Sequence, residues 1–388
     1  MLFRIVTLVF LFTVSFSAIS KASLKTTPIY SSELTRLLED LCDKDIVILG
    51  EDANHGSAKT LKVKAQITRQ LIETCNFNQL GLESQVYDLI DFSNKLHTGN
   101  ASAKRLQQSV SYFLSSAKVL EEFFVYLFEE AQNSKLEIFG FDHQIGGRGQ
   151  FFAQKELPDQ LTRYLDQEKI ECKKKITQLT QWQYTQETPF GKEVIAELQS
   201  CLDKIKTATQ KFKHNEDSKQ IALMNNNLKS FLDAFSGNTF NARDKAMFSN
   251  IVEYFSRPSL KSKKKLVIWT ATIHALKSNQ GISGQLIPMG QHLNELYEKS
   301  VARIGFTALK GSFGRGTKIH AVPKANRGAL EQVISKNHSG EWIYLDNNAL
   351  TQLGKVEAKL INYIKPSEAD WSRLIDGVIV LDTEEAIK

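Results

Sequence analysis

Three residues that could take part in acid–base chemistry lie close together in the chain: Glu51, Asp52 and His55. They follow the apolar run 46–50, which ends in glycine and is typical of a buried parallel strand. A carboxylate that holds one ring nitrogen of a histidine leaves the other nitrogen free to take a proton. The stretch therefore predicts a general-base site. The alternative is an acidic cap at the start of a helix.

Polar side chains also follow three other segments that have the pattern of buried strands. They are Glu83 at the end of 79–83, Asp142 and His143 after 136–141, and His274 after 265–269. The carboxyl ends of parallel strands lie along one edge of a sheet, where open α/β sheets bind ligands. We therefore expect these groups to converge on one pocket.

His55 is the residue that we expect to act as the general base. The unperturbed pKa of histidine is about 6.5, which suits the deprotonation of a water molecule at neutral pH. Glu83, together with either Glu51 or Asp52, would orient the His55 ring, and His274 is a further catalytic candidate.

Strand and helix patterns alternate up to about residue 150. Helical periodicity occupies 57–74, 86–96 and 119–130, between the strands named above. This order predicts an α/β fold: a doubly wound, mostly parallel sheet with helices on both faces. Long polar helical stretches predict a helical insertion from about 150 to 240, with an antiparallel pair and a third helix at 217–235. Further strand patterns occur at 265–269, 300–309, 318–322, 342–345 and 377–381.

The composition is that of a globular chain. With 388 residues, of which 42% are hydrophobic and 24% charged, the chain can build a sizeable core. The formal charge of +6 is spread along the sequence, and the lysine runs 173–175 and 263–265 are not interleaved with aromatic residues. We therefore expect no nucleic-acid partner.

The first residues have the pattern of a secretory signal peptide. Arg4 precedes the apolar run 5–16, and small residues follow up to Ala22, with Ala18 as an alternative cleavage position. The apolar run is too short for a comfortable membrane span. We predict a signal peptide at 1–22, a mature domain at 23–388 and a periplasmic or secreted protein without a stable membrane span.

Four cysteines remain in the predicted mature chain. An even number of cysteines in an exported protein allows two disulfides with three possible connectivities. We expect Cys42 to pair with Cys75 and Cys172 with Cys201, because the members of each pair lie close in sequence. No spacing of these residues is typical of a zinc site.

Eight segments of the chain match, in the same order, motifs of one known protein family. They are 50–57, Arg69 with Leu71 and Phe77, Leu82-Glu83, 139–144, 243–247 with Asn250, 269–274, 289–293, and 305–307 with Gly311-Ser312. Together they cover roughly residues 45–315 and resemble the erythromycin esterase family.

The resemblance implies a hydrolase whose activated water attacks an ester or lactone carbonyl, with no acyl-enzyme, no metal and no other cofactor. Its substrate would be a small molecule, and the family name implies a macrolide. Lys64, Asp142 and Arg243 are the candidates for substrate contact. Asp142 would otherwise cap a turn, and Arg243 would otherwise pair with Asp244 to close the insertion.

The sequence departs from the family pattern in three places. One additional residue separates Gly50 from His55, so that Glu51 or Asp52 could take the acidic position. Lys64 replaces an arginine, which keeps the charge but loses the planar two-point fork. Ala271 and Thr272 replace a histidine and an asparagine. These changes indicate a different substrate, slower chemistry or a scaffold kept for binding alone.

Two other classes of function remain open. The first alternative is a catalytically inactive protein that binds a metal, haem or small ligand on the same scaffold. The second is a structural or effector protein that binds other proteins.

The glycine-rich segment 311–316 lies between two strand patterns and predicts a hairpin turn and not a phosphate loop. No Gly-x-Ser-x-Gly motif occurs, which argues against a serine hydrolase.

Overall fold

The computed structural model describes residues 32–145, 151–212, 215–235, 239–257, 263–282, 285–335 and 340–387. The predicted signal peptide at 1–22 lies outside these ranges. Within them, no helix is both long enough and apolar enough to cross a membrane.

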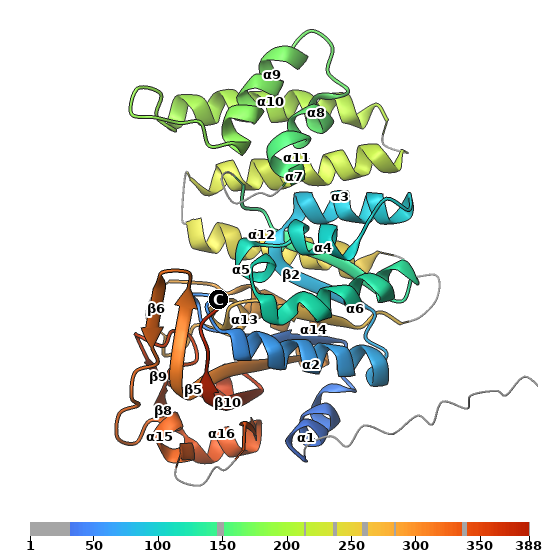
Figure 1. Cartoon of the computed structure of the whole chain (residues 1–388). Helices are drawn as coiled ribbons and strands as arrows, with labels where there is room; N and C mark the ends of the chain where they lie inside the picture. The colour runs from blue at the N-terminus through green and yellow to red at the C-terminus, as the bar shows by residue number, and fades with distance from the viewer. Residues whose placement is uncertain are drawn as a thin grey trace, which may run out of the picture.

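A central sheet runs through the molecule in the strand order β3-β2-β4-β1-β5-β10-β7, with β6 paired to β5 (Figure 1). Five of the pairings on this path are parallel, whereas β7 runs antiparallel to β10 and β6 runs antiparallel to β5. The mostly parallel sheet confirms the predicted α/β fold class. The strands of this sheet are β1 Ile46–Leu49, β2 Gln79–Gln85, β3 Glu137–Asp142, β4 Leu266–Trp269, β5 Val301–Arg315, β6 Lys318–Ala321, β7 Trp342–Asp346 and β10 Gly377–Glu384.

Helices cover both faces of the sheet. α2 (Ala58–Cys75) and α6 (Glu121–Gln132) pack on one face, and α12 (Thr239–Ser256) and α14 (Met289–Tyr297) pack on the other. The remaining helices before and within the insertion are α1 Ser32–Leu41, α3 Val86–His97, α4 Ala103–Ser109, α5 Tyr112–Ser115, α7 Phe151–Lys155, α8 Leu157–Thr162, α9 Lys169–Thr180, α10 Lys192–Gln210 and α11 Glu216–Ala234. Those after it are α13 Thr272–Ala275, α15 Leu330–Ser335 and α16 Asn347–Leu353.

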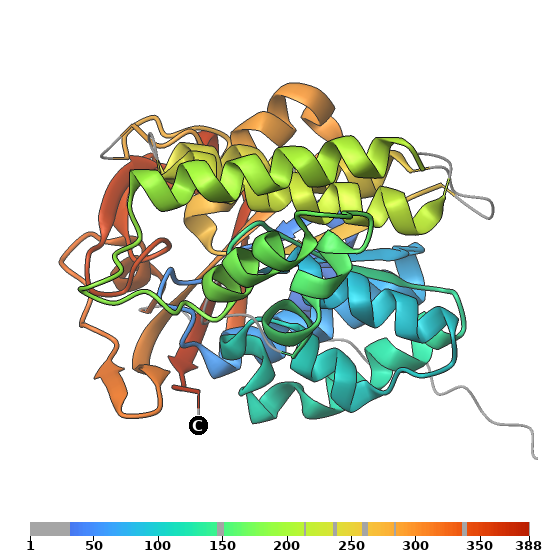
Figure 2. The same cartoon turned by 90° about the horizontal axis from the view of Figure 1, so that it is seen from above.

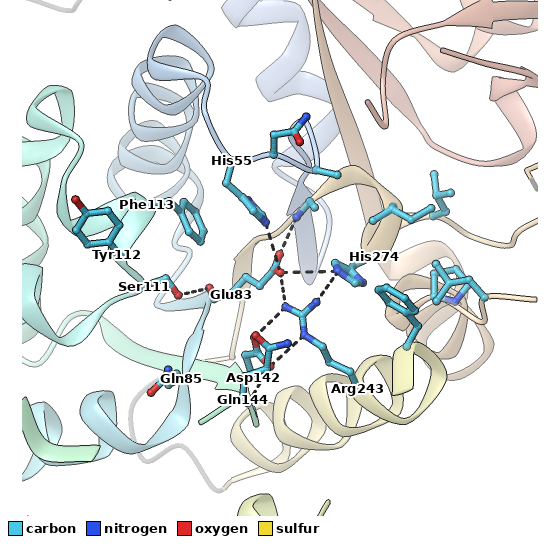
Figure 3. Close-up of a pocket in the computed structure, with 18 of the residues that line it drawn as sticks. His55, Glu83, Gln85, Ser111, Tyr112, Phe113, Asp142, Gln144, Arg243 and His274 are labelled. Atoms are coloured by element: carbon cyan, nitrogen blue, oxygen red, sulfur yellow. Dashed lines mark hydrogen bonds and ion pairs between the residues drawn. The ribbon is translucent and has the colours of Figure 1, made fainter. Parts of the chain in front are cut away.

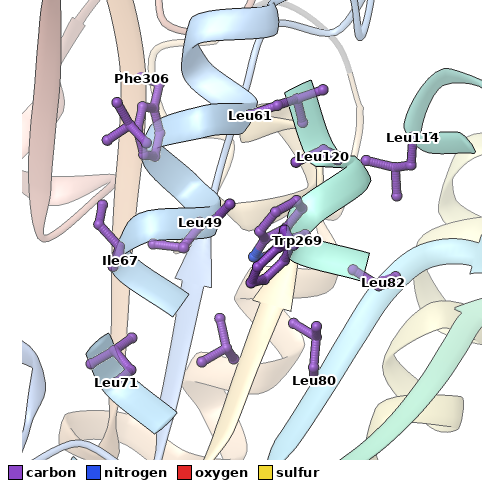
Figure 4. Close-up of a cluster of buried hydrophobic side chains, with 14 of the residues drawn as sticks. Leu49, Leu61, Ile67, Leu71, Leu80, Leu82, Leu114, Leu120, Trp269 and Phe306 are labelled. Carbon is purple, nitrogen blue, oxygen red and sulfur yellow. The ribbon is translucent and has the colours of Figure 1, made fainter. Parts of the chain in front are cut away.

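Burial on both faces explains why β1 is a continuous apolar run. Val47 and Leu49 belong to the core under α2, and Ile46 and Ile48 belong to the core under α12 and α14. Successive side chains of a strand point to opposite faces, so a strand covered on both faces needs apolar residues at every position. Figure 4 shows the first of these cores, in which Leu49 lies among residues of α2 and neighbouring strands.

The helices α7 to α11 form an insertion with a hydrophobic cluster of its own, to which α3 also contributes. In Figure 1 this insertion lies above the sheet, and Figure 2 shows it from above. α10 and α11 run in opposite directions, because Gln199 binds Asp233 and, further along α10, Asp203 binds the earlier residue Lys229 of α11. α11 is the predicted third helix. The predicted antiparallel pair is α9 and α10, which are joined in opposite directions by Cys172–Cys201 and by the ion pair Lys175–Glu197. The short helices α7 and α8 precede the pair, and α12 continues the helical region past residue 240.

Both predicted disulfides are present, Cys42–Cys75 and Cys172–Cys201. The second one joins α9 to α10 inside the insertion. The glycine-rich segment forms the predicted hairpin, with Arg315 opposite Lys318. Two short strands were not predicted. They are β8 (Lys355–Ala358) and β9 (Ser367–Asp370), which among the described strands pair only with each other.

Candidate active site

A cavity of about 1310 Å³ opens where β1, β2, β3 and β4 end. Residues at or just after the ends of these strands line its floor together with Arg243 of α12, and α5 and α7 contribute to its walls. Figure 3 shows the floor: the side chains of His55, Glu83, Asp142, Arg243 and His274 meet there. The parallel sheet thus brings together groups that lie far apart in the sequence, as predicted for strand ends.

His55 lies in the loop between β1 and α2 and has a φ of 52°, in the left-handed region. Its ring stacks on Phe113, with 4.2 Å between the ring centroids. Nδ1 lies 3.3 Å from Oε1 of Glu51, and Nε2 lies 3.8 Å from Oε1 of Glu83. Nδ1 therefore faces Glu51 at ion-pair distance, and Nε2 faces Glu83, which lines the cavity.

Of the two consecutive acids, only Glu51 contacts the His55 ring with its carboxylate, whereas Asp52 meets His55 only through its backbone carbonyl. The Asp52 carboxylate accepts hydrogen bonds from Asn54, at 2.9 Å from both the backbone N and Nδ2, and from the backbone N of Tyr363 at 2.8 Å. Asp52 closes the loop and anchors it to a distant segment. The catalytic candidate Asp52 is thus placed in a structural position, because backbone N–H groups occupy both of its oxygens.

Lys64 does not lie where a substrate could touch it. Its side chain is fully buried on α2, with Nζ 3.3 Å from Oε1 of Glu51 and 4.9 Å from the centroid of the Trp269 ring. It lies behind Glu51, outside the lining of the cavity. This position corrects the prediction of substrate contact: Lys64 compensates the charge of the acid that holds His55.

Glu83 is the shared anion of the site. Its Oε1 accepts a hydrogen bond of 2.7 Å from Nη2 of Arg243, and its Oε2 accepts bonds from Oγ1 of Thr270 at 2.7 Å and from the backbone N of Ala271 at 2.9 Å. The same Oε1 lies 3.8 Å from Nε2 of both His55 and His274. Both oxygens are therefore fixed, and the charge lies between the two imidazole rings.

Arg243 binds both carboxylates on the cavity floor. Besides Glu83, it donates from Nε to Oδ1 of Asp142 at 3.3 Å and from Nη2 to Oδ2 of Asp142 at 2.9 Å. Its Nη1 lies 3.2 Å from Nε2 of His274. Because a guanidinium can only donate, Nε2 of His274 is the acceptor. These contacts use four of the five N–H groups, and the remaining Nη1–H has no partner among the described residues.

His274 has a hydrogen-bond partner at each of its ring nitrogens. Its Nε2 accepts from Arg243, so the ring proton must be on Nδ1, which lies 2.9 Å from Oδ1 of Asp244. The same Asp244 oxygen accepts from the backbone N of Met289 at 2.7 Å. The predicted Arg243–Asp244 pair is therefore wrong. Successive side chains of a helix point about 100° apart, so these two reach different partners.

The charges of the site shift the pKa values of its members in opposite directions. Burial alone would raise the pKa of Glu83, but the positive charge of Arg243 and the hydrogen bond from the backbone N of Ala271 oppose burial, and the pKa lies well below its usual range. Burial alone would lower the pKa of His55, but Glu83 and Glu51 raise it above its ordinary value. For Glu51, Lys64 and His55 overcome the effect of burial and lower the pKa. At neutral pH the floor thus holds fixed carboxylates around a histidine that is more basic than usual.

Several residues of the site carried no signal in the sequence. Phe113 stacks on His55 from the short helix α5, in a region where the sequence shows no motif. Asp244 lay in a recognised segment but was assigned the wrong partner. His143, which follows β3, points away from the floor, with Nδ1 3.2 Å from Oγ of Ser230. Among the described residues, no group of three or more His, Cys, Asp or Glu side chains is placed to hold a metal ion.

The end of β10 fixes the start of α2, next to the His55 loop. The buried Glu384 accepts hydrogen bonds from the backbone N of Lys59 at 2.9 Å and from that of Thr60 at 3.3 Å, and Oγ1 of Thr60 donates to it at 2.5 Å. These are N–H groups of the first helical turn, which have no partner within the helix. Glu384 therefore caps α2 from a distant strand.

Replacing Glu384 with glutamine is expected to change how stability depends on pH. Burial raises the pKa of Glu384 from 4.5 to about 7, so between these values the folded protein binds a proton that the unfolded chain does not. The contribution of this group to stability falls as the pH rises through that window, by about 3 kcal/mol in total. Urea unfolding at pH 5 and pH 8 should show a smaller difference for Glu384→Gln than for the wild type. The neighbouring, exposed Glu385→Gln is the matched control, and an unchanged difference in Glu384→Gln would contradict the assignment.

Comparisons with known proteins place the fold. The erythromycin esterase family model matches residues 72–383, a range that includes Glu83, Asp142, Arg243 and His274 and begins after His55. A comparison with curated proteins found no match.

Three solved structures have the same fold. One is a Bacillus cereus protein, with 15% sequence identity and a TM-score of 0.69 over 91% of this chain and 92% of that one. Another is a succinoglycan biosynthesis protein, with 15% identity and a TM-score of 0.69 over 92% of each chain. The third is a histidine-to-asparagine variant of the erythromycin esterase EreC in its open conformation, with 17% identity and a TM-score of 0.64 over 90% of this chain and 93% of that one. Because the family model covers most of its length, the chain belongs to the erythromycin esterase family.

Proposed function

We propose that this chain is an exported hydrolase that cleaves a small-molecule ester or lactone with a water molecule activated by His55. One observation carries the proposal: Nε2 of His55 faces the cavity floor while Nδ1 lies at ion-pair distance from Glu51. Export is supported by the signal-peptide pattern of residues 1–22, and hydrolysis by membership of the family.

His55 is better placed than His274 to act as the base. The lone pair of His274 Nε2 already accepts a hydrogen bond from Arg243, so it is not free for a proton from water. Nε2 of His55 has no such donor, and its distance of 3.8 Å from Glu83 exceeds a direct hydrogen bond. The nearby carboxylates favour the imidazolium that forms when His55 takes a proton.

The proposed reaction has two steps, attack by water and collapse of a tetrahedral intermediate. A water O–H proton moves to Nε2 of His55 while the water oxygen forms a bond to the carbonyl carbon. The carbonyl oxygen then carries the negative charge, and the fifth N–H of Arg243 is the donor available to stabilise it. When the tetrahedral intermediate collapses, the C–O bond to the leaving group breaks, and His55 returns the proton to the departing alkoxide.

Kinetics on a panel of simple esters, lactones and macrolides tests this proposal. Direct attack by water predicts that the alcohol and the acid appear together in the first turnover, because no acyl-enzyme forms. An initial burst of alcohol would indicate a covalent intermediate and overturn the water mechanism. Absence of turnover on the whole panel, together with saturable binding of a panel member, would favour a binding protein on the same scaffold.

The pH dependence of kcat/KM should reveal the base. If neutral His55 is the active form, kcat/KM falls as the pH drops below the pKa of His55, and this midpoint should lie above 6.5 because the carboxylates raise it. Glu51→Gln removes one of the anions that raise it, so the midpoint should move to lower pH. A midpoint that does not move would exclude either His55 or its contact with Glu51 from the titration. Asp52→Asn is the control, because the Asp52 carboxylate binds Asn54 and Tyr363 and does not contact the His55 ring.

A further inference from the structure

The charged residues that line the cavity fall into two groups. On the floor, Arg243 binds both Glu83 and Asp142, so these charges largely compensate one another. Lys155 and Arg315 also line the cavity, and neither forms an ion pair with a described residue. The cavity therefore has two uncompensated positive charges away from its floor.

These two cations come from separate parts of the fold. Lys155 ends α7, in the helical insertion, and Arg315 ends β5, at the hairpin with β6 (Figure 1). The hairpin is tied to the catalytic loop, because the backbone N of Gly314 donates to the carbonyl of Gly56 at 2.9 Å. The position of Arg315 is thereby coupled to that of the loop that carries His55.

The cavity wall carries both apolar and polar side chains. The apolar ones include Phe113, Ile273, Leu276, Ile282, Leu286 and Pro288, and the polar ones include Gln85, Ser111 and Gln285. A ligand that fills the cavity would place an apolar body against the apolar part of this wall and its reactive carbonyl at His55. Any part that reaches Lys155 or Arg315 would meet positive charge at a partly solvated position, where attraction to an anion is favourable and depends on salt.

We propose that the substrate of this site carries an acidic group, such as a carboxylate, apart from the ester or lactone that is cleaved, and that Lys155 and Arg315 attract and hold that group. This inference rests on the proposed function and narrows its substrate class. It makes the site selective for anionic over neutral substrates of the same length.

A matched pair of substrates tests the proposal: the 4-nitrophenyl half-ester of adipic acid and its neutral primary amide. The two have the same length and leaving group and differ in one negative charge. Wild-type protein should have a kcat/KM about tenfold higher for the acid, the size expected of a charge-assisted contact near the surface. The double variant Lys155→Gln/Arg315→Gln should lose this preference and keep its kcat/KM for the amide. High salt should reduce the wild-type preference as well.

The control is Lys318→Gln, which removes the same charge from the same hairpin but outside the cavity lining. It should leave the preference for the acid unchanged. Equal kcat/KM values for the two esters in the wild type, or a preference that survives in the double variant, would overturn the proposal.

Calorimetric binding of adipate, which cannot be hydrolysed, separates this proposal from the function on which it rests. Binding of adipate by the wild type but not by the double variant, without turnover of any ester, would support the anion site and refute the hydrolase. Turnover of both esters without adipate binding or charge preference would support the hydrolase and refute the anion site.

Discussion

Replacement of His55 by asparagine is expected to lower kcat/KM by about 10²–10⁴-fold, the usual contribution of a general base. An asparagine amide cannot take the proton that Nε2 of His55 would accept from water. Asparagine is preferable to alanine here because His55 has a φ of 52°, a conformation that asparagine tolerates better than most residues. The melting temperature should therefore change little, and the loss should lie in kcat.

The matched control is His292→Asn. His292 is a partly exposed histidine on α14, 3.8 Å from Glu295 and outside the cavity lining, and its loss should leave kcat/KM unchanged. A second variant, His55→Gly, fits the same backbone conformation and leaves space for a free imidazole. Partial restoration of activity by added imidazole would show that the missing group is a base and not a packing element. Activity within threefold of the wild type in His55→Asn would remove His55 from the mechanism.

The central strands could be predicted because burial on both faces requires an apolar residue at each consecutive position. Each side chain of β1 packs on a helix, so the strand is apolar at every position and stands out in the sequence. β8 and β9 form a small separate sheet in which only Val356, Ala358 and Ala369 are buried, so no continuous apolar run marks these strands, and they were missed. The strand ends converge for a topological reason, which is why Glu83, Asp142 and His274 could be expected near His55.

The details of the site could not be predicted, because they depend on contacts between distant segments. Glu51 and Asp52 are adjacent acids. They differ because the backbone N–H of Tyr363, from the C-terminal part of the chain, donates to the Asp52 carboxylate. Glu384 caps α2 across a separation of 324 residues from Thr60. Lys64 looked like a substrate ligand because its charge was visible in the sequence, whereas its complete burial behind Glu51 was not.

Glu83→Gln is expected to be as damaging as the loss of His55, and for two reasons. The first is catalytic: removing the anion removes the charge that favours the His55 imidazolium, and we expect kcat/KM to fall by about 10²–10³-fold. The second is structural. Donors face both carboxylate oxygens, Arg243 on one side and the backbone N–H of Ala271 on the other, so either orientation of the amide sets an N–H group against a donor. The free energy of unfolding should fall by about 3–5 kcal/mol.

Two further variants separate these effects. Asp142→Asn also removes a carboxylate partner of Arg243, but Arg243 keeps its 2.7 Å bond to Glu83, and neither His55 nitrogen is in contact with Asp142. It should destabilise the protein while leaving the acidic midpoint of the pH profile in place. Glu83→Asp keeps the charge but shortens the side chain, and should recover part of the activity that Glu83→Gln loses.

The pH profile decides whether Glu83 acts on His55 or only holds Arg243 in place. Because Glu83 is the largest of the influences that raise the pKa of His55, its neutralisation should move the acidic midpoint of kcat/KM to lower pH, in the same direction as Glu51→Gln. A purely structural role would lower kcat/KM at all pH values without moving that midpoint. A shift in Glu83→Gln together with an unmoved midpoint in Asp142→Asn would therefore assign the effect to the carboxylate that faces the base, because both variants remove one partner of the same arginine.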